Sequence, residues 1–329
     1  MLKNEILKIL RESDSHISGQ ELCERFGVSR TAIWKAINSL RDEGYEIEAV
    51  SNRGYVLKSL ADTLRSEEIE GFLETKWLGR HILSFDTIDS TNNELRRRFE
   101  NTPDIADGTL AITGNQTNGR GRRGRSWNAP AESNIAMSFL LKPDFPPEKA
   151  SMMTILAALS VAAAIEEVTD LSGQIKWPND VLVNKKKCCG ILTEMSCERD
   201  YINYAIVGIG INANTDSFPP EYGEHSSSLF LETGERVKRA QLAAAVLKAF
   251  EGYYGSFVKV QSLEPFMEEY NGKLLGIGNI VKVLDPKGEF TGTSRGINSQ
   301  GELLVEKEDG SLTEIYAGEV SVRGIYGYV

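Results

Sequence analysis

Residues 18–44 read Ser-Gly-Gln-Glu-Leu-Cys-Glu-Arg-Phe-Gly-Val-Ser-Arg-Thr-Ala-Ile-Trp-Lys-Ala-Ile-Asn-Ser-Leu-Arg-Asp-Glu-Gly, and this stretch predicts two helices joined by a tight turn. Ser18 and Glu21 fit a capping box, in which each side chain satisfies a backbone amide of the other at the start of a helix. The residues from Phe26 to Ser29 are typical of a turn whose last residue caps the next helix. In that helix the apolar residues recur at i, i+3, i+4 and i+7, which buries one face: Ile33, Ala36, Ile37 and Leu40.

The flanking residues complete a winged helix-turn-helix. Ile6 and Leu10 predict an earlier amphipathic helix, and short strands are expected near 45–50 and 54–57. This arrangement binds DNA, with the later helix in the major groove and the wing beside it. The alternative is a winged helix that contacts only proteins. The side chains predicted to reach phosphates and base edges, the last of them from the wing, are Arg30, Thr31, Trp34, Lys35, Asn38, Arg41 and Arg53.

The charge of the chain is unevenly distributed, and this restricts where nucleic acid could bind. The net charge is −10, yet residues 1–60 hold nine Lys and Arg against nine Asp and Glu. The negative excess therefore lies entirely after residue 60, and an acidic surface repels phosphate. We expect DNA binding only within the first 60 residues.

The rest of the chain predicts two further domains, which suits a length of 329 residues. After about residue 67 the expected strands come in hairpin-like groups between helices, which indicates an α+β domain rather than strict βα alternation. The tail has short alternating runs separated by turn signals, which predicts a small β-barrel. The expected domains are a winged helix-turn-helix at 1–62, an α+β domain at 67–270 and the barrel at 277–329.

Individual elements of the α+β domain follow from periodicity and capping. One long, Ala-rich helix is apolar nearly all round, which indicates burial. The helices are expected at 89–99, 152–168 and 241–257, and the strands at 110–113, 135–141, 175–177, 181–184, 190–195 and 204–211.

Composition narrows the remaining classes. We expect no apolar run to approach the roughly 18 residues that a membrane helix needs, and the first residues lack a signal pattern, so we predict a cytoplasmic protein without membrane partners. Four cysteines and three histidines lack metal-ligand spacing, so no protein metal site is expected. We expect the cysteines to be small buried side chains.

The segment Gly119-Arg120-Gly121-Arg122-Arg123-Gly124-Arg125-Ser126-Trp127, called here the Arg/Gly loop, is the most informative in the chain. It places four arginines and three glycines in seven positions. Glycine lets backbone amides approach an anion, and arginine supplies planar forks for phosphate or carboxylate. We expect the loop to close over an anionic ligand. An Arg/Gly-rich RNA-binding stretch is the alternative, which its short length and its position between two strands disfavour.

Two further segments carry candidate functional groups. Lys176-Trp177-Pro178-Asn179-Asp180, followed by Lys187-Cys188-Cys189-Gly190, places lysine, amide and carboxylate groups at strand ends. In Val207-Gly208-Ile209-Gly210-Ile211-Asn212, two glycines interrupt a strand and leave room for a ligand against the backbone. This is not the glycine pattern of a dinucleotide fold, because no helix follows it.

Together these motifs resemble the bifunctional members of the biotin protein ligase family, which also repress biotin genes. The resemblance also includes Asp89-Ser90-Thr91-Asn92, Gln116 and Gly318-Glu319-Val320-Ser321-Val322-Arg323, and it spans essentially the whole chain. It implies a central domain like that of class II synthetases, with a mixed or antiparallel sheet, and an SH3-like C-terminal barrel. Lys187 is chosen from three consecutive lysines because it stands three residues before Gly190, and Ser126 stands where some relatives have lysine.

The resemblance also implies roles for residues of this sequence. Lys187, Arg122 and Asp180 would be catalytic, with Asp180 as a base or an orienting group. Biotin would be bound by Ser90, Thr91, Asn92, Gln116, Arg120, Gly121, Arg122, Lys187, Gly190, Gly208 and Gly210. ATP would be bound by Arg120, Arg122, Arg123, Trp127, Asn179, Lys187, Asn212 and Arg323.

The implied reaction joins biotin to ATP as biotinyl-5′-AMP and then moves biotin to a lysine of biotin carboxyl carrier protein. Two anions must approach each other in the first step, so cations placed in advance suit the chemistry. Mg²⁺ would bridge phosphate oxygens of ATP rather than occupy a protein cage. The implied repressor dimerises when the adenylate is bound and then grips operator DNA. A biotin sensor without transferase activity and a lipoate ligase are the alternatives.

Overall fold

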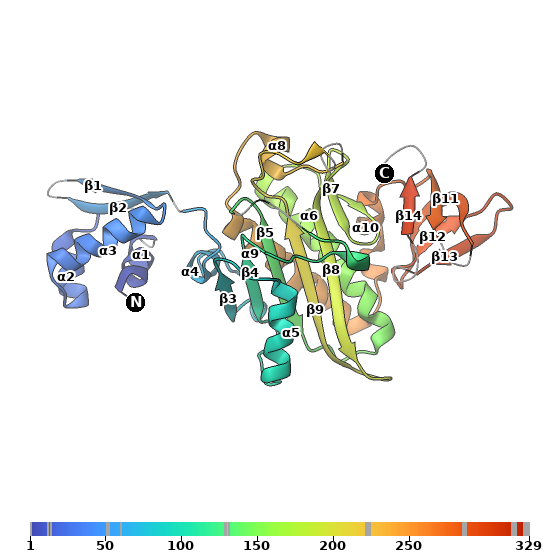
Figure 1. Ribbon diagram of the computed structural model, residues 1–329, viewed down its shortest axis with the longest axis horizontal. Helices are drawn as coiled ribbons and strands as arrows, with labels where there is room; N and C mark the ends of the chain where they lie inside the picture. Colours follow the sequence, from blue (N-terminus) through green and yellow to red (C-terminus); the bar gives the residue numbers. More distant parts are fainter. Residues whose placement is uncertain are drawn as a thin grey trace. The chain divides into compact units, whose positions relative to one another are not determined.

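The computed structural model describes residues 2–11, 13, 15–50, 53–59, 61–127, 130, 132–220, 225–284, 288–316 and 321–324, of which 59 and 321–324 are described by their backbone alone. The chain forms two compact units, residues 1–63 and 64–329 (Figure 1). The predicted division into three domains stays a prediction, because the central and C-terminal parts lie within one unit.

The N-terminal unit is the expected helix-turn-helix with a two-stranded wing. The side chain of Ser18 accepts the backbone N–H of Glu21 at 3.0 Å, and Ser29 accepts that of Ala32 at 3.2 Å, so both predicted caps form. Gly27 ends the second helix in the left-handed conformation, with φ 64°. The elements are α1 (Leu2–Arg11), α2 (Gly19–Phe26), α3 (Arg30–Asp42), β1 (Glu46–Val50) and β2 (Gly54–Ser59).

The wing packs closely against the segment that leads into α2. Tyr55 and Ile17 exchange two backbone hydrogen bonds of 2.8 Å. Gly54 has a φ of 106°, and a Cβ there would lie 2.0 Å from the carbonyl oxygen of Ile17. Glycine is therefore required where β2 begins, for conformation and for space.

The larger unit is built on one mixed seven-stranded sheet in the order β3-β4-β5-β9-β8-β7-β6. Strands β3 and β4 are parallel, and every other neighbouring pair is antiparallel. This confirms the α+β prediction. The strands are β3 (Ile82–Phe85), β4 (Leu110–Thr113), β5 (Ile135–Leu141), β6 (Gln174–Lys176), β7 (Asp180–Val183), β8 (Lys186–Cys197) and β9 (Ile202–Ile211).

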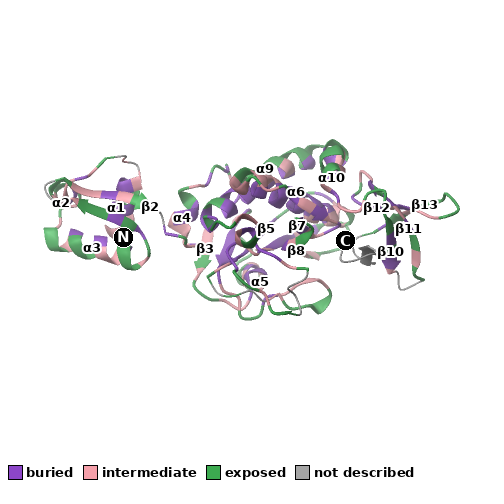
Figure 2. Ribbon diagram, turned by 90° about the horizontal axis from the view of Figure 1, so that it is seen from above, coloured by how far each residue is buried: buried purple, intermediate pink, exposed green. Residues whose placement is uncertain are grey.

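Helices cover the two faces of this sheet unequally. The long helices α6 (Ala150–Thr169) and α9 (Arg239–Val260) pack on one face, and α5 (Thr91–Asn101) packs on the other (Figures 1 and 2). Purple ribbon in Figure 2 concentrates between the long helices and the sheet, where the main apolar core lies. On the face of the sheet that carries α5, the candidate site lies beside this helix.

Helix α6 corrects one expectation from composition. By length and composition the segment Pro147–Thr169 could cross a membrane, contrary to our prediction that no such run occurs. Of its most apolar window, 67% is buried inside the unit. It packs against α9, β8 and β9, so the apolar composition is accounted for by core packing.

The C-terminal part is a small antiparallel sheet, which confirms the strands predicted for the tail, while its closure into an SH3-like barrel stays a prediction. Its five strands lie in the order β13-β12-β11-β10-β14. The indole N–H of Trp177 donates to the carbonyl of Gly301 at 3.0 Å, which joins this domain to the candidate site. The strands are β10 (Ile280–Leu284), β11 (Phe290–Ile297), β12 (Leu303–Glu306), β13 (Leu312–Ile315) and β14 (Ser321–Gly324).

Several short elements were not expected from the sequence. These elements, and also β3, are too short for a hydrophobic periodicity to be recognised in their sequences. They are α4 (Ser66–Glu70), α8 (Leu229–Thr233), α10 (Met267–Lys273) and the 3₁₀ turns Arg122–Gly124, Pro147–Lys149 and Glu264–Phe266.

Candidate active site

A cavity of about 550 Å³ lies on the α5 face of the sheet, over the ends of β5, β7, β8 and β9. It brings together segments that are up to 135 positions apart in the sequence, from Ser90 to His225. The residues that line it are Ser90, Thr91, Asn92, Gln116, 120–123, 125–127, Ala136, Met137, 176–180, Lys187, 190–192, 208–210 and His225.

The cavity unites nearly all of the sequence-predicted site residues. All eleven positions predicted for biotin line it, as do six of the eight predicted for ATP. Asn212 is not part of the lining, and its side-chain amide donates to the carbonyl of Ser227 at 3.1 Å. Arg323 lies on β14, and its side chain is outside the described residues, as are Gly318, Glu319 and Val320. The roles assigned to these positions stay predictions.

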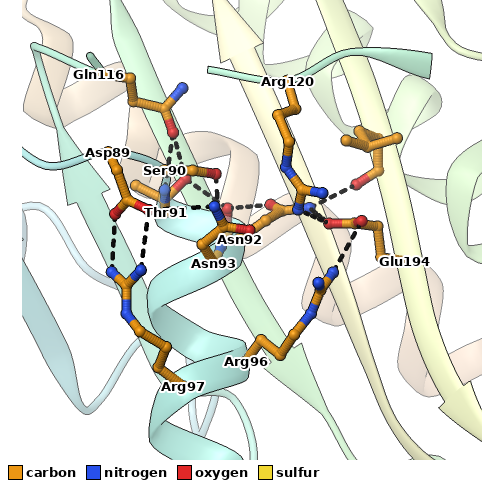
Figure 3. Close-up of polar contacts among 12 residues, drawn as sticks. Asp89, Ser90, Thr91, Asn92, Asn93, Arg96, Arg97, Gln116, Arg120 and Glu194 are labelled. Carbon is orange, nitrogen blue, oxygen red and sulfur yellow. Dashed lines mark hydrogen bonds and ion pairs between the residues drawn. The ribbon is translucent and has the colours of Figure 1, made fainter. Parts of the chain in front are cut away.

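The start of α5 forms the polar end of the cavity. Ser90 is the N-cap of α5, and its hydroxyl accepts the backbone N–H of Asn93 at 3.5 Å. The backbone N–H of Thr91 donates to the amide oxygen of Gln116 at 2.8 Å (Figure 3). The guanidinium of Arg97 bonds both carboxylate oxygens of Asp89 and holds the pKa of that carboxyl far below its usual range. The turn before the helix is thereby fixed.

Two glycines in β9 leave the wall of the cavity without side chains at their positions. Gly208 and Gly210 lie two positions apart, so they face the same side of the sheet. A Cβ on Gly208 would lie 2.2 Å from Asn92 Oδ1, and a Cβ on Gly210 would lie 2.6 Å from the ring of Trp127. Both glycines are therefore required by contacts from outside the strand.

The Arg/Gly loop crosses the cavity as a small hairpin. Its base is closed by the backbone bond from Trp127 N to Gly119 O, 2.9 Å, and its tip by the bond from Gly121 N to Arg125 O, 2.7 Å. Between them Arg123 takes a left-handed conformation with φ 57°. The loop thus presents a compact cluster of cations over the opening.

Two arginines of the loop reach down into the cavity. Arg120 donates to Glu194 on β8 at 2.7 Å, while its Nε is buried without a hydrogen-bond partner among the described residues. Arg122 donates to the amide oxygen of Asn179 at 2.8 Å. Burial, and then the neighbouring charge of Arg123, lower the pKa of Arg122 from its ordinary value. An anionic ligand would offset both the burial of the Arg122 charge and its repulsion by Arg123.

Lys187 and Asp180 form the opposite rim. Their Nζ and Oδ1 atoms are 2.6 Å apart, with side chains 28% and 14% exposed. The same oxygen of Asp180 accepts the side-chain amide of Asn179 at 3.0 Å. The lysine selected from three candidates is the one that faces the cavity, whereas Lys186 pairs with Glu232 outside it.

The sequence did not reveal two polar residues, Ser138 and Glu194, that contact the cavity residues Thr91 and Arg120. Ser138 is fully buried on β5, and its hydroxyl lies 2.6 Å from that of Thr91. Glu194 on β8 contacts both Arg96 and Arg120, at 2.9 and 2.7 Å (Figure 3). The alternation of side chains along a strand could have identified both residues. Ser138 lies two positions after Ala136, and Glu194 lies two positions after Leu192, so each is on the same side of the sheet as a residue that lines the cavity.

The predicted DNA-contacting residues belong to the other unit. Trp34 is 56% exposed, which is unusual for so large an apolar side chain and suits a contact surface. Arg30, Thr31, Lys35 and Arg53 are exposed, and Asn38 is half-buried. Arg41 instead donates twice to the carbonyl of Ile47, at 3.0 and 2.7 Å, and so ties α3 to the wing.

Cysteine and metal chemistry are not evident at the site. Cys188 and Cys189 are buried, and burial raises the pKa of the Cys188 thiol to about 12. The expectation of burial is wrong for Cys197, which is exposed, and Cys23 is half-buried. Within the part of the chain that the structure describes, no group of three or more His, Cys, Asp or Glu is placed to hold a metal ion.

Comparison with known proteins decides the family. The chain matches models of an HTH domain at residues 3–56, of the biotin/lipoate A/B protein ligase family at 84–212, and of the biotin protein ligase C-terminal domain at 276–323. The bifunctional ligase/repressor BirA of Bacillus spizizenii is 37% identical over 324 residues, which cover 98% of each chain. The chain belongs to the bifunctional biotin ligase/repressor family. This confirms the resemblance inferred from the motifs.

Other relatives agree with this assignment. The bifunctional ligase/repressor BirA of Escherichia coli is 29% identical over 318 residues, covering 97% of this chain and 96% of the relative. A solved structure of the biotin protein ligase from Aquifex aeolicus in complex with biotin and ATP is 33% identical, with a TM-score of 0.66. It covers 74% of this chain and 99% of the Aquifex chain, so it matches the ligase part.

Proposed function

We propose that this family member activates biotin with ATP as biotinyl-5′-AMP, transfers biotin to a lysine of biotin carboxyl carrier protein, and represses biotin synthesis genes through its winged helix. The observation that carries the ligase activity is the cavity itself. One end is a polar pocket at the start of α5, with Arg120 beside it, and another part is a rim that holds Lys187 and Arg122. This arrangement suits a neutral polar ring joined by an apolar arm to a carboxylate.

In the first step a biotin carboxylate oxygen attacks the α-phosphorus of ATP, and pyrophosphate leaves. Both partners are anions, so their approach is opposed by charge repulsion. Lys187 and Arg122 stand at the rim where the carboxylate and the α-phosphate would meet. Cations fixed in place before the reaction stabilise the charge that builds up in the transition state. The triphosphate, rather than protein side chains, would hold Mg²⁺, which would supply compensating positive charge.

In the second step the amine of the carrier lysine attacks the acyl carbon of the mixed anhydride, AMP leaves, and the amine loses a proton. Asp180 Oδ1 lies 2.6 Å from Lys187 Nζ. This contact supports the orienting role for Asp180 over that of a free base, because its oxygen already accepts from Lys187 and Asn179. We place the reaction in the cytoplasm, where the carrier proteins are made.

The transfer reaction is tested directly with purified protein. We expect a carrier domain incubated with the protein, biotin and Mg-ATP to gain the mass of one biotin, and no gain without ATP. Lipoate in place of biotin is the control for the other substrate class of the matched family. A carrier that gains lipoate instead would show that the pocket takes a different acid, and no gain with either acid would leave only a sensor.

For the repressor, we propose that adenylate binding promotes a homodimer that grips a two-fold symmetric operator. One winged helix with a neutral balance of charge binds DNA weakly, so two linked copies would be needed. We expect a gel shift of operator DNA to tighten at least tenfold when biotin and ATP are both present. Trp34→Ala should remove most of this binding without changing adenylate synthesis. Equal DNA binding with and without the ligands would contradict the proposal.

A further inference from the structure

The first limb of the Arg/Gly loop lies beside the polar pocket at the start of α5. Gly119 packs against Gln116, because a Cβ on this glycine would lie 2.9 Å from Gln116 Nε2 and 2.3 Å from the carbonyl oxygen of Trp127. The amide oxygen of the same Gln116 accepts the backbone N–H of Thr91 at 2.8 Å. A displacement of this limb would therefore open the pocket on the side where α5 begins.

Arg120 holds this limb to the sheet. It lies between the two backbone bonds that close the hairpin, Trp127 N to Gly119 O and Gly121 N to Arg125 O, so a movement of Arg120 would disturb both. Its guanidinium donates from Nη2 to Glu194 Oε2 at 2.7 Å, and within the described part of the chain its side chain has no other hydrogen-bond partner. The position of the limb therefore depends on this one ion pair.

Glu194 is well placed to keep the guanidinium where it is. It stands on β8 opposite Ile206 of β9, so its backbone belongs to the sheet. Its Oε2 also accepts the side-chain amide of Asn92 at 2.8 Å, and its Oε1 accepts Arg96 at 2.9 Å (Figure 3). The two arginines use different oxygens, so loss of Arg96 would leave the contact with Arg120 in place.

We propose that Glu194 is a positioning residue that anchors the Arg/Gly loop over the cavity through Arg120 and thereby raises the affinity for biotin. The inference rests on the proposed biotin site. Every contact of the anchor lies within the chain itself, so the anchor favours the closed loop before substrate enters. The apparent Kd of a ligand that binds only the closed loop is its intrinsic Kd divided by the closed fraction. A smaller closed fraction therefore weakens binding.

Glu194→Gln breaks the anchor while keeping the size of the side chain. A glutamine has one amide oxygen, so its NH₂ group must face a donor at one of the two positions where Glu194 accepts. The negative charge opposite Arg120 is also lost. The side chain of Arg120 is 34% exposed, so it can turn out to water, which is more favourable than a partly buried charge without a counter-ion. We expect the loop to be open most of the time in this variant.

Hydrogen exchange of the loop amides in the protein alone measures this opening. The N–H groups of Gly121 and Trp127 are bonded within the hairpin and exchange when it opens. Their exchange should be at least tenfold faster in Glu194→Gln than in the wild type. Arg96→Gln is the matched control, because it removes the other guanidinium from the same carboxylate, and its exchange should stay within threefold. Unchanged exchange in Glu194→Gln, or an equal acceleration in both variants, would overturn the proposal.

Binding and kinetics connect the anchor to function. Glu194→Gln should raise the Kd of biotin, measured by calorimetry without ATP, about tenfold. The kcat of adenylate synthesis at saturating biotin and ATP should stay within threefold, because bound substrates shift the loop back to the closed state. A lower kcat with an unchanged Kd would place Glu194 in the chemical step. Faster exchange with an unchanged Kd would separate the loop from biotin binding, and either result contradicts the proposal.

Arg120→Gln shows whether Glu194 acts through Arg120 or through Asn92. In this background Glu194→Gln should accelerate loop exchange less than twofold further, because both changes break one contact. Effects that multiply would assign the role to Asn92 and refute the anchor.

Thermal unfolding shows whether each variant folds. If Glu194→Gln does not fold, Arg120→Gln alone decides, since it leaves Asn92 and Arg96 on the carboxylate. Its loop should then exchange at least tenfold faster than that of the wild type, and unchanged exchange would contradict the proposal. A wild type that binds no biotin would refute the proposed function, whereas the exchange comparison would still decide whether Glu194 anchors the loop.

Discussion

Replacing Lys187 by methionine is expected to lower the kcat of biotinyl-adenylate synthesis by roughly 10²–10³-fold, which is typical for removal of one group that stabilises transition-state charge. Methionine keeps most of the length and apolar contact of the side chain but removes its charge. Lys187 lines the cavity and lies 2.6 Å from Asp180. The change should therefore affect the chemical step more than the binding of biotin. Release of pyrophosphate under saturating biotin and ATP measures it.

The neighbouring Lys186 supplies a matched control. It lies one position earlier on β8, is 47% exposed, and pairs with Glu232 rather than with a cavity residue. Lys186→Met should retain adenylate synthesis within about twofold, because among the described residues the Lys186 side chain contacts no residue of the cavity and its partner Glu232 keeps hydrogen bonds from Asn184 and Ser227. A similar loss of activity in both variants would mean that the protein needs the total charge of the segment and not the placement of Lys187.

The charge left on Asp180 must be separated from the effect on chemistry. In Lys187→Met this carboxylate, 14% exposed, loses the cation 2.6 Å away, and a largely buried charge with less compensation destabilises a fold. The double variant Asp180→Asn and Lys187→Met removes both charges. We expect it to recover thermal stability but not activity, and recovery of both would assign the single-variant loss to folding.

Local sequence signals were sufficient for the regular elements and for the motif residues. The caps Ser18 and Ser29 stand where the sequence places them. Strands β4 and β5 have the predicted bounds, because alternation and apolar runs report directly on how a strand is buried. Residues of the Arg/Gly loop were found because so many arginines and glycines together have few structural uses.

The network beneath the loop could not be found in the same way. Ser138 is a single polar residue within an apolar strand, and Glu194 lies in the more polar second half of β8; polar residues are common where a strand faces solvent. Their contribution to the site depends on the order of the strands, in which β5 and β8 lie on either side of β9. Only the folded sheet defines that order. For Arg41 the sequence led to the opposite mistake. Its outward position on the helix predicted a side chain available to DNA, whereas it donates to the carbonyl of Ile47.

Gly208→Ala is expected to weaken biotin binding about 100-fold, equivalent to about 2.8 kcal/mol. The added Cβ would lie 2.2 Å from Oδ1 and 3.0 Å from Cγ of Asn92, and neither β9 in the middle of the sheet nor the buried amide has free space. The amide must therefore move away from Ser138 and Glu194, which breaks two buried hydrogen bonds and adds strain. Calorimetry with biotin alone measures the loss.

The double variant Asn92→Ala and Gly208→Ala tests whether this clash is the cause. All three atoms of Asn92 that crowd the new Cβ lie beyond its own Cβ, so alanine removes them. We expect the double variant to regain most of the thermal stability lost by Gly208→Ala, while biotin binding stays weak because the hydrogen bonds of Asn92 with Ser138 and Glu194 are gone. Gly252→Ala, on α9 with nothing within 4 Å of the added Cβ, should leave binding unchanged. If the double variant bound biotin like the wild type, Asn92 would only fill space, and the cavity would recognise its ligand without the network beneath it.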